Sequence, residues 1–170
     1  SDVCSSDLIL QHAFQPAAQE VFAKGIRLMT HWHVRELPEV KTTNYITPIL
    51  LRKKMAEAGA QDVLYHDGQF ISESSRSNVF VVNQEGVLVT PDRQILEGIT
   101  RRHVIELARE TMEVEIRPIT LEEALAAREV FLTSTTKGTL AVVAIDDQVI
   151  GNGKPGPVCQ QLYEGYHQHF

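Results

Sequence analysis

The chain has 170 residues, 43% of them hydrophobic, which is enough to bury the core of one domain. A formal net charge of −6 without any basic cluster argues against nucleic-acid binding, and no apolar run approaches the roughly 20 residues of a membrane span. Two cysteines without metal-ligand spacing, Cys4 and Cys159, favour a reducing cytoplasmic compartment over a disulfide-stabilised fold.

The first eight residues form no recognisable structural pattern. They read Ser-Asp-Val-Cys-Ser-Ser-Asp-Leu, without an initiator methionine or a signal-peptide pattern. This octapeptide corresponds to one reading frame of a common sequencing-library adapter, so we interpret residues 1–8 as an assembly artefact, with a disordered polar tail as the alternative. We expect residues 9–20 to be a remnant of an interdomain region and residues 21–170 to form one domain.

The first half of this domain is predicted to be mostly strands. Residues 21–29 lead into a β-like segment through His33, and loosely helical apolar spacing over 49–58 ends at Gly59, a typical C-cap glycine. Short strands are predicted at 62–65, 69–71, 79–82 and 87–89. The Asp67-Gly68 and Glu85-Gly86 dipeptides between apolar runs predict hairpin turns.

The second half alternates helices with buried strands. A helix is predicted over 100–112, and Thr120 with Glu123 has the capping-box spacing for a short helix through residue 127. Strands are predicted at 130–133 and 140–145, and a final amphipathic helix at 157–166. The mixture of hairpins and separate helices predicts an α/β (mixed α+β) domain with a mixed, partly antiparallel sheet.

Four short segments carry residues that could do chemistry, although each also has an ordinary structural interpretation. Lys41 could form a Schiff base if partial burial or nearby positive charge keeps its amine neutral, or it could be a solvated lysine. Glu73 could hold the protonated ring nitrogen of a cofactor, or it could be a turn acid. Gly98-Ile99-Thr100 could bind an anion at a helix start, or Thr100 could be a plain N-cap. Ser134-Thr135-Thr136 could add hydroxyl and backbone donors, or it could simply be a polar strand end.

Taken in order, these segments resemble the class IV aminotransferases, which are pyridoxal phosphate enzymes of fold type IV. The family includes branched-chain and D-amino-acid transaminases and aminodeoxychorismate lyase. The resemblance covers roughly residues 20 to 170. Its motifs are Glu-Val-Lys-Thr-Thr-Asn-Tyr, Glu-Ser-Ser-Arg-Ser-Asn-Val-Phe, Leu-Glu-Gly-Ile-Thr-Arg, Glu-Val-Phe-Leu-Thr-Ser-Thr-Thr and Ile-Gly-Asn-Gly-Lys-Pro-Gly-Pro.

The resemblance implies a role for each matching position. Lys41 would carry pyridoxal 5'-phosphate and act as base and acid in the proton shift, and Glu73 would hold the pyridinium nitrogen. Further cofactor contacts would come from Leu96 under the ring, Ile99 and Thr100 at the phosphate, Ser134 and Thr135 as a second phosphate contact, and Tyr45 near the phenolic oxygen. Thr136 and Lys137 would present backbone donors to a substrate carboxylate, although Lys137 is larger than the family's usual residue there and Gly138 replaces a usual glutamate.

The resemblance also implies the context of the reaction. Family members carry a smaller N-terminal domain, which is absent from this sequence, so we expect this chain to be the cofactor-binding large domain of a truncated protein. The full-length enzyme would be a homodimer acting on amino acids and 2-oxo acids. A transaminase for D-amino or branched-chain amino acids is the first hypothesis. An aminodeoxychorismate lyase and an inactive fragment that keeps only the fold are the alternatives.

His31 and His33 lie two residues apart on a predicted strand, so both could face one metal ion. Because no third ligand is suitably spaced, we predict an ordinary strand face and no metal site.

Overall fold

The computed structural model describes residues 18–169. The interpretations of residues 1–8 and of most of residues 9–20 therefore lie outside the described residues. In the described part, no helix combines the length and the apolar character needed to cross a membrane.

Within the described residues, nine strands form one mixed sheet in the order β3-β2-β1-β8-β7-β4-β5-β6, with β9 paired to β8. The strands are β1 (Ile26–Trp32), β2 (Asp62–His66), β3 (Ile71–Ser74), β4 (Asn78–Val82), β5 (Leu88–Thr90), β6 (Val114–Ile116), β7 (Glu129–Ser134), β8 (Gly138–Ile145) and β9 (Gln148–Val149). Parallel pairing joins β1 to β2 and β8, and β5 to β6, while the other pairs are antiparallel. The prediction of a mixed, partly antiparallel sheet is confirmed.

A further pairing closes part of the sheet on itself. Glu73 of β3 pairs with Asn78 of β4, so β3, β2, β1, β8, β7 and β4 follow one another around a ring. The same cross-strand row continues from Asn78 to Thr133 of β7 and from Thr133 to Thr139 of β8. Polar residues that are far apart in the sequence are therefore neighbours at the closure.

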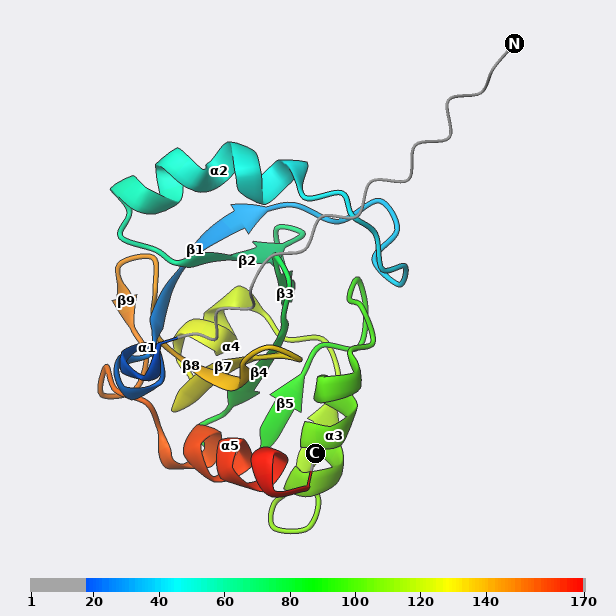
Figure 1. Cartoon of the computed structure of the whole chain (residues 1–170), viewed down its shortest axis with the longest axis vertical. Helices are drawn as coiled ribbons and strands as arrows, with labels where there is room; N and C mark the ends of the chain where they lie inside the picture. Colours follow the sequence, from blue (N-terminus) through cyan, green and yellow to red (C-terminus); the bar gives the residue numbers. More distant parts are fainter. Residues whose placement is uncertain (1–17, 170) are drawn as a thin grey trace, which may run out of the picture.

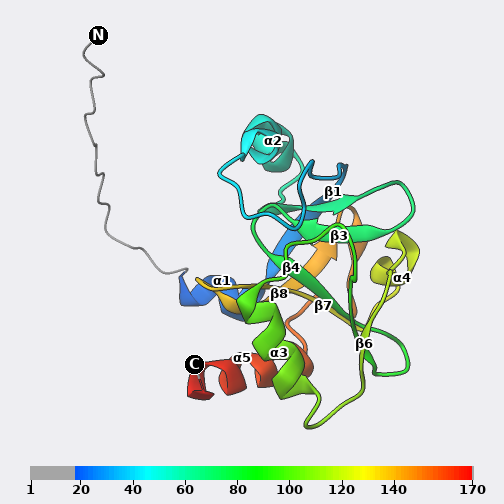
Figure 2. The ribbon, with the colours of Figure 1, turned by 90° about the vertical axis from the view of Figure 1, so that its right-hand side faces the viewer.

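Helices cover this sheet on several sides (Figures 1 and 2). They are α1 (Gln19–Lys24), α2 (Ile46–Glu57), α3 (Ile99–Ala108), α4 (Leu121–Leu125) and α5 (Pro157–His169). α3 and α5 pack together over β7 and β8, where the stacked rings of Phe80 and Phe131 lie 5.2 Å apart. A second core around Val79, Val81 and Leu132 is covered by α4, and α2 packs on β2.

Most predicted elements form, with shifted ends. The Thr120 hydroxyl accepts from the Glu123 N–H, as the capping-box pattern predicts, but the Glu123 carboxylate binds Arg117. β3 begins at Ile71 and not at residue 69, because the Asp67 carboxylate accepts the N–H groups of Gln69 and Phe70 and holds them in the turn. The sequence analysis missed α1 and the three-residue strand β6.

A buried glutamate fixes the start of α5. The Glu129 carboxylate accepts the backbone N–H groups of Val158 and Cys159 at 3.1 and 3.0 Å. Gly156 packs so closely on this side chain that a Cβ there would overlap the Glu129 carboxylate. The Glu129 carboxylate thus accepts from two N–H groups that have no acceptor within the helix. It also lies at the positive end of the helix dipole.

We therefore expect Glu129→Ala to destabilise the protein, because it leaves two buried N–H groups without acceptors. The free energy of unfolding should fall by about 1–3 kcal/mol, measured by urea denaturation. Glu106→Ala removes an exposed glutamate of α3 and should change it by less than about 0.5 kcal/mol. Equal losses in the two variants would contradict this role of Glu129.

Candidate active site

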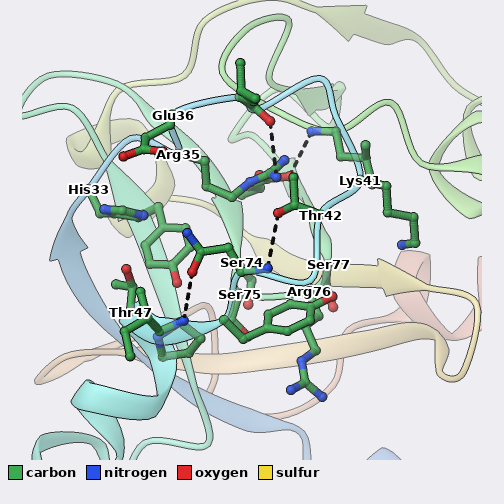
Figure 3. Close-up of a pocket in the computed structure, with 18 of the residues that line it drawn as sticks. His33, Arg35, Glu36, Lys41, Thr42, Thr47, Ser74, Ser75, Arg76 and Ser77 are labelled. Atoms are coloured by element: carbon green, nitrogen blue, oxygen red, sulfur yellow. Dashed lines mark hydrogen bonds and ion pairs between the residues drawn. The ribbon is translucent and has the colours of Figure 1, made fainter. Parts of the chain in front are cut away.

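A cavity of about 240 Å³ lies between the segment that joins β1 to α2 and the turn that joins β3 to β4 (Figure 3). Of the residues predicted from the sequence, Lys41, Tyr45, Glu73 and Leu96 line it. Lys41 and Tyr45 come from the segment before α2, Glu73 from β3, and Leu96 from the loop before α3. The fold therefore brings the predicted lysine and the predicted carboxylate to one cavity.

Glu73 is buried and held from two sides. Its Oε1 accepts from Arg35 Nε at 2.6 Å, and its Oε2 accepts from the Leu96 N–H at 2.9 Å. The side chains of Arg35 and Glu73 are 20% and 5% exposed, so water screens this ion pair poorly. Two donors thus fix both oxygens of a carboxylate at the cavity wall.

Burial dominates the charge state of Glu73. Desolvation raises the pKa of its carboxyl above the usual value, whereas the Leu96 N–H, the Arg35 guanidinium and the charge of Lys41 act in the opposite direction. The neighbouring Tyr65 also lines the cavity, and burial, with Asp62 and Glu73 adding to it, raises its pKa to about 12. Burial thus raises the pKa of both Glu73 and Tyr65, and the hydrogen-bond partners of Glu73 act against it.

Arg35 also shapes the segment that carries Lys41. Its guanidinium donates to the carbonyl oxygens of Leu37, Pro38 and Val40, which immediately precede Lys41. One arginine thus links the backbone that leads into the lysine with the Glu73 carboxylate. Lys41 itself is exposed, so the described residues give its amine little burial.

Asn78 connects the cavity to the start of α3. Its Nδ2 donates to the Leu96 carbonyl, and its Oδ1 occupies the space that a Cβ on Gly98 would need. Gly98 is therefore needed for this close approach, and it is the N-cap of α3. Ile99 and Thr100, the predicted anion-binding residues, form the first turn; the Thr100 side chain is buried and that of Ile99 is 65% exposed.

Ser134, Thr135, Thr136 and Lys137 form the end of β7 and the turn into β8, where the Lys137 N–H donates to the Ser134 carbonyl. None of them lines the cavity, and neither do Ile99 and Thr100. The β4–β7 register nevertheless pairs Asn78, which does line it, with Thr133, immediately before Ser134. Both predicted anion-binding segments therefore adjoin Asn78, through Gly98 and Thr133 respectively.

Several buried hydroxyl groups near this wall have no hydrogen-bond partner within residues 18–169. They belong to Ser74, Ser77, Thr133 and Ser134. Buried polar groups are normally satisfied, so the hydroxyl groups of Ser74 and Ser77, which line the cavity, can serve as partners for a polar ligand. Together with a lysine and a buried, anchored carboxylate, these donors fit a cofactor that has an aldehyde, a protonatable ring nitrogen and a phosphate.

No group of three or more potential metal ligands was found among residues 18–169. The rings of His31 and His33 lie 6.2 Å apart, and His33 packs edge-on against Tyr65 at 4.8 Å. Burial, then His31 and Arg35, lower the pKa of His33. His31 lies on β1, whereas His33 follows the strand and lines the cavity.

The sequence analysis missed two arginines at the cavity, Arg35 and Arg76. Arg35 lies six residues before Lys41, and the intervening Pro38 was a signal for the turn that folds it back. Arg76 stands inside the Glu-Ser-Ser-Arg-Ser-Asn motif, and the sequence holds no signal that separates it from an ordinary turn arginine. Both line the cavity.

Comparisons with known proteins agree with the family resemblance that the sequence motifs indicate. The family described as "Amino-transferase class IV" matches residues 5–145. A probable branched-chain-amino-acid aminotransferase of Aquifex aeolicus is 38% identical over 126 residues, covering 72% of this chain and 40% of that protein. A D-alanine aminotransferase of Listeria monocytogenes is 34% identical over 178 residues, covering 99% of this chain and 60% of that protein.

Solved structures give the same result. The branched-chain amino acid aminotransferase from Thermobaculum terrenum, in its PLP-bound holo form, superposes with a TM-score of 0.80 at 31% identity, covering 90% of this chain and 53% of that one. A putative 4-amino-4-deoxychorismate lyase from Legionella pneumophila, at 24% identity and a TM-score of 0.78, covers 94% of this chain and 59% of that one and shares the fold. The chain spans about half the length of the relatives that it matches.

Proposed function

This chain belongs to the class IV aminotransferase family, and from that membership we propose that its full-length protein is a pyridoxal phosphate-dependent transaminase. It would transfer the amino group of an amino acid to a 2-oxo acid. D-amino acids and branched-chain amino acids are the two proposed donor classes, since relatives of both names are similar to this chain. We further propose a cytoplasmic homodimer.

The observation that carries the proposal is the meeting of Lys41 and Glu73 at one cavity. When bound, pyridoxal phosphate supplies an aldehyde that exchanges amino groups and a ring that withdraws electrons. Lys41 would hold the cofactor through Nζ, and the Glu73 carboxylate would bind its ring nitrogen. Leu96 would contact the ring, and Tyr45 would lie near its phenolic oxygen.

The phosphate would bind at the start of α3. The N–H groups of Ile99 and Thr100 are in the first turn, where unsatisfied donors and the helix dipole favour an anion. The unpartnered hydroxyl of Ser134, with Thr135 beside it, would add donors. The backbone of Thr136 and Lys137 would bind a substrate carboxylate.

During the reaction, Lys41 would also move a proton. Its Nζ would accept the proton that leaves the substrate Cα and then donate it again, acting first as base and then as acid. The ion pair with Arg35 and the Leu96 N–H would favour the ionised form of Glu73 and so oppose the burial that raises its pKa.

The test uses the full-length protein reconstituted with pyridoxal phosphate. We expect a visible absorption band on binding, and conversion of 2-oxoglutarate to glutamate with D-alanine or L-leucine as donor. The preferred donor assigns the substrate class. No band would contradict the cofactor assignment, and pyruvate release from aminodeoxychorismate without any amino acceptor would replace the transaminase proposal with a lyase.

A further inference from the structure

Arg76 lies on the β3–β4 turn and, like Lys41 and Glu73, is one of the residues that line the cavity (Figure 3). Its guanidinium carbon lies 4.4 Å from the centre of the Tyr45 ring, within the range of a cation–π contact. Tyr45 precedes α2, so this contact spans the cavity's two sides. Stacking holds a long, exposed side chain in one direction while its N–H groups remain available.

The donors of Arg76 have no acceptor in the part of the chain that the structure describes, where no hydrogen bond or ion pair to its side chain is found. Four other arginines (Arg52, Arg102, Arg109 and Arg128) likewise have no acceptor among the described residues, but they lie outside the cavity, whereas the remaining five have acceptors. Carboxylate, hydroxyl or carbonyl oxygens accept from Arg27, Arg35, Arg93, Arg101 and Arg117. A guanidinium presents five donors in a planar fork that matches a carboxylate. Arg76 is therefore poised for a ligand with that geometry.

The charges around the cavity favour an anion. Three strongly basic side chains line it (Arg35, Lys41 and Arg76) against two acidic ones (Glu36 and Glu73). Arg35 and Glu73 neutralise each other, and Lys41 would bind the cofactor. Arg76 then remains together with the exposed Glu36, and Arg76 is the side chain of the two that can bind an anionic substrate.

We propose that Arg76 binds a carboxylate group of the amino-acid or 2-oxo-acid substrate, an inference that rests on the proposed function. The carboxylate is either the one beside the reacting carbon or a second one at the far end of a dicarboxylic substrate. Either carboxylate would make the same bidentate contact with the guanidinium. Comparing the binding of a monocarboxylate with that of a dicarboxylate distinguishes the two cases.

The experiment measures dissociation constants of butyrate and glutarate by calorimetry for the cofactor-loaded full-length protein and its Arg76→Gln variant. If Arg76 binds the carboxylate beside the reacting carbon, both probes should bind about tenfold more weakly to the variant, since one charge-assisted contact is lost. If it binds the distal carboxylate, only glutarate should weaken. Unchanged constants for both probes would overturn the proposal.

Two further variants sharpen the result. Arg93→Gln is the matched control, because Arg93 also stacks on an aromatic ring, that of Phe70 at 5.3 Å, but pairs with Asp92 and lies outside the cavity. It should leave both constants unchanged. Arg76→Lys keeps the charge without the planar fork, and it should recover part of the lost affinity. Equal losses in the Arg93 and Arg76 variants would overturn the proposal by showing a non-local charge effect.

The visible band separates this inference from the function on which it rests. A wild-type protein with the band but with probe affinities insensitive to Arg76 would refute the role of Arg76 and leave the transaminase intact. A wild-type protein without the band would refute the function, whatever the variants do. An Arg76→Gln protein that keeps the band and its urea midpoint shows that lost affinity is not lost folding.

Discussion

Replacing Lys41 with alanine is expected to lower the rate of amino transfer by about 10²- to 10⁴-fold, the usual contribution of a positioned acid–base group. The variant loses both the amine that would hold the cofactor and the group that would move the Cα proton. Its visible absorption band should disappear or shift, while its urea midpoint should match the wild type, because Lys41 is exposed and makes no buried contact.

Two companion variants separate chemistry from charge. Lys41→Arg keeps a positive charge near Glu73 but has no neutral amine, so it should be as inactive as the alanine variant. Lys53→Ala removes an exposed lysine of α2 that pairs with Glu57, and it should retain full activity. An active Lys41→Ala protein, assayed with either donor class, would refute the assignment of Lys41.

Local patterns predicted most elements because each depends on neighbours in the sequence. The Asp67-Gly68 turn and the Thr120 cap act over three residues, so their hydrogen bonds follow directly from spacing. β6 was missed because three residues are too few for a period, and its partner β5 lies far back in the chain. The ring closure was missed because it also requires the pairings of β1 with β8 and of β4 with β7, whose strands are far apart in the sequence.

The candidate site shows the same limit. Lys41, Glu73 and Leu96 could be proposed because each belongs to a motif of fixed order. The bond from the Leu96 N–H to Glu73 spans 23 residues, and that from Arg35 spans 38, so neither could be read from spacing. Arg35 and Arg76 acquire their roles only when the fold brings β1, the β3–β4 turn and α2 around one cavity.

Arg35→Met is expected to have the second large effect, by leaving the Glu73 carboxylate buried without its cation. Breaking one side of such a pair costs about 3 kcal/mol. The same change takes the donors away from the Leu37, Pro38 and Val40 carbonyls, so the segment before Lys41 should loosen. We therefore expect weaker cofactor affinity as well as a lower free energy of unfolding.

The pH dependence identifies Glu73 as the cause. Burial already raises the pKa of Glu73, and removing Arg35 should raise it further. A carboxyl whose pKa is raised on folding contributes stability that is present below its unfolded-state pKa and lost as pH rises through the folded-state value. Arg35→Met should therefore lose more stability between about pH 5 and about pH 8 than the wild type does.

A second substitution tests that explanation directly. Glu73→Gln added to Arg35→Met removes the titrating group, so the extra pH dependence should vanish even though the side-chain size is kept. Arg117→Met is the control, because Arg117 pairs with Glu115 and Glu123 where all three side chains are more exposed, and it should cost no more than about 1 kcal/mol at either pH. A double variant that keeps the steep pH dependence would assign it to another group and remove Arg35 as the residue that holds Glu73 ionised.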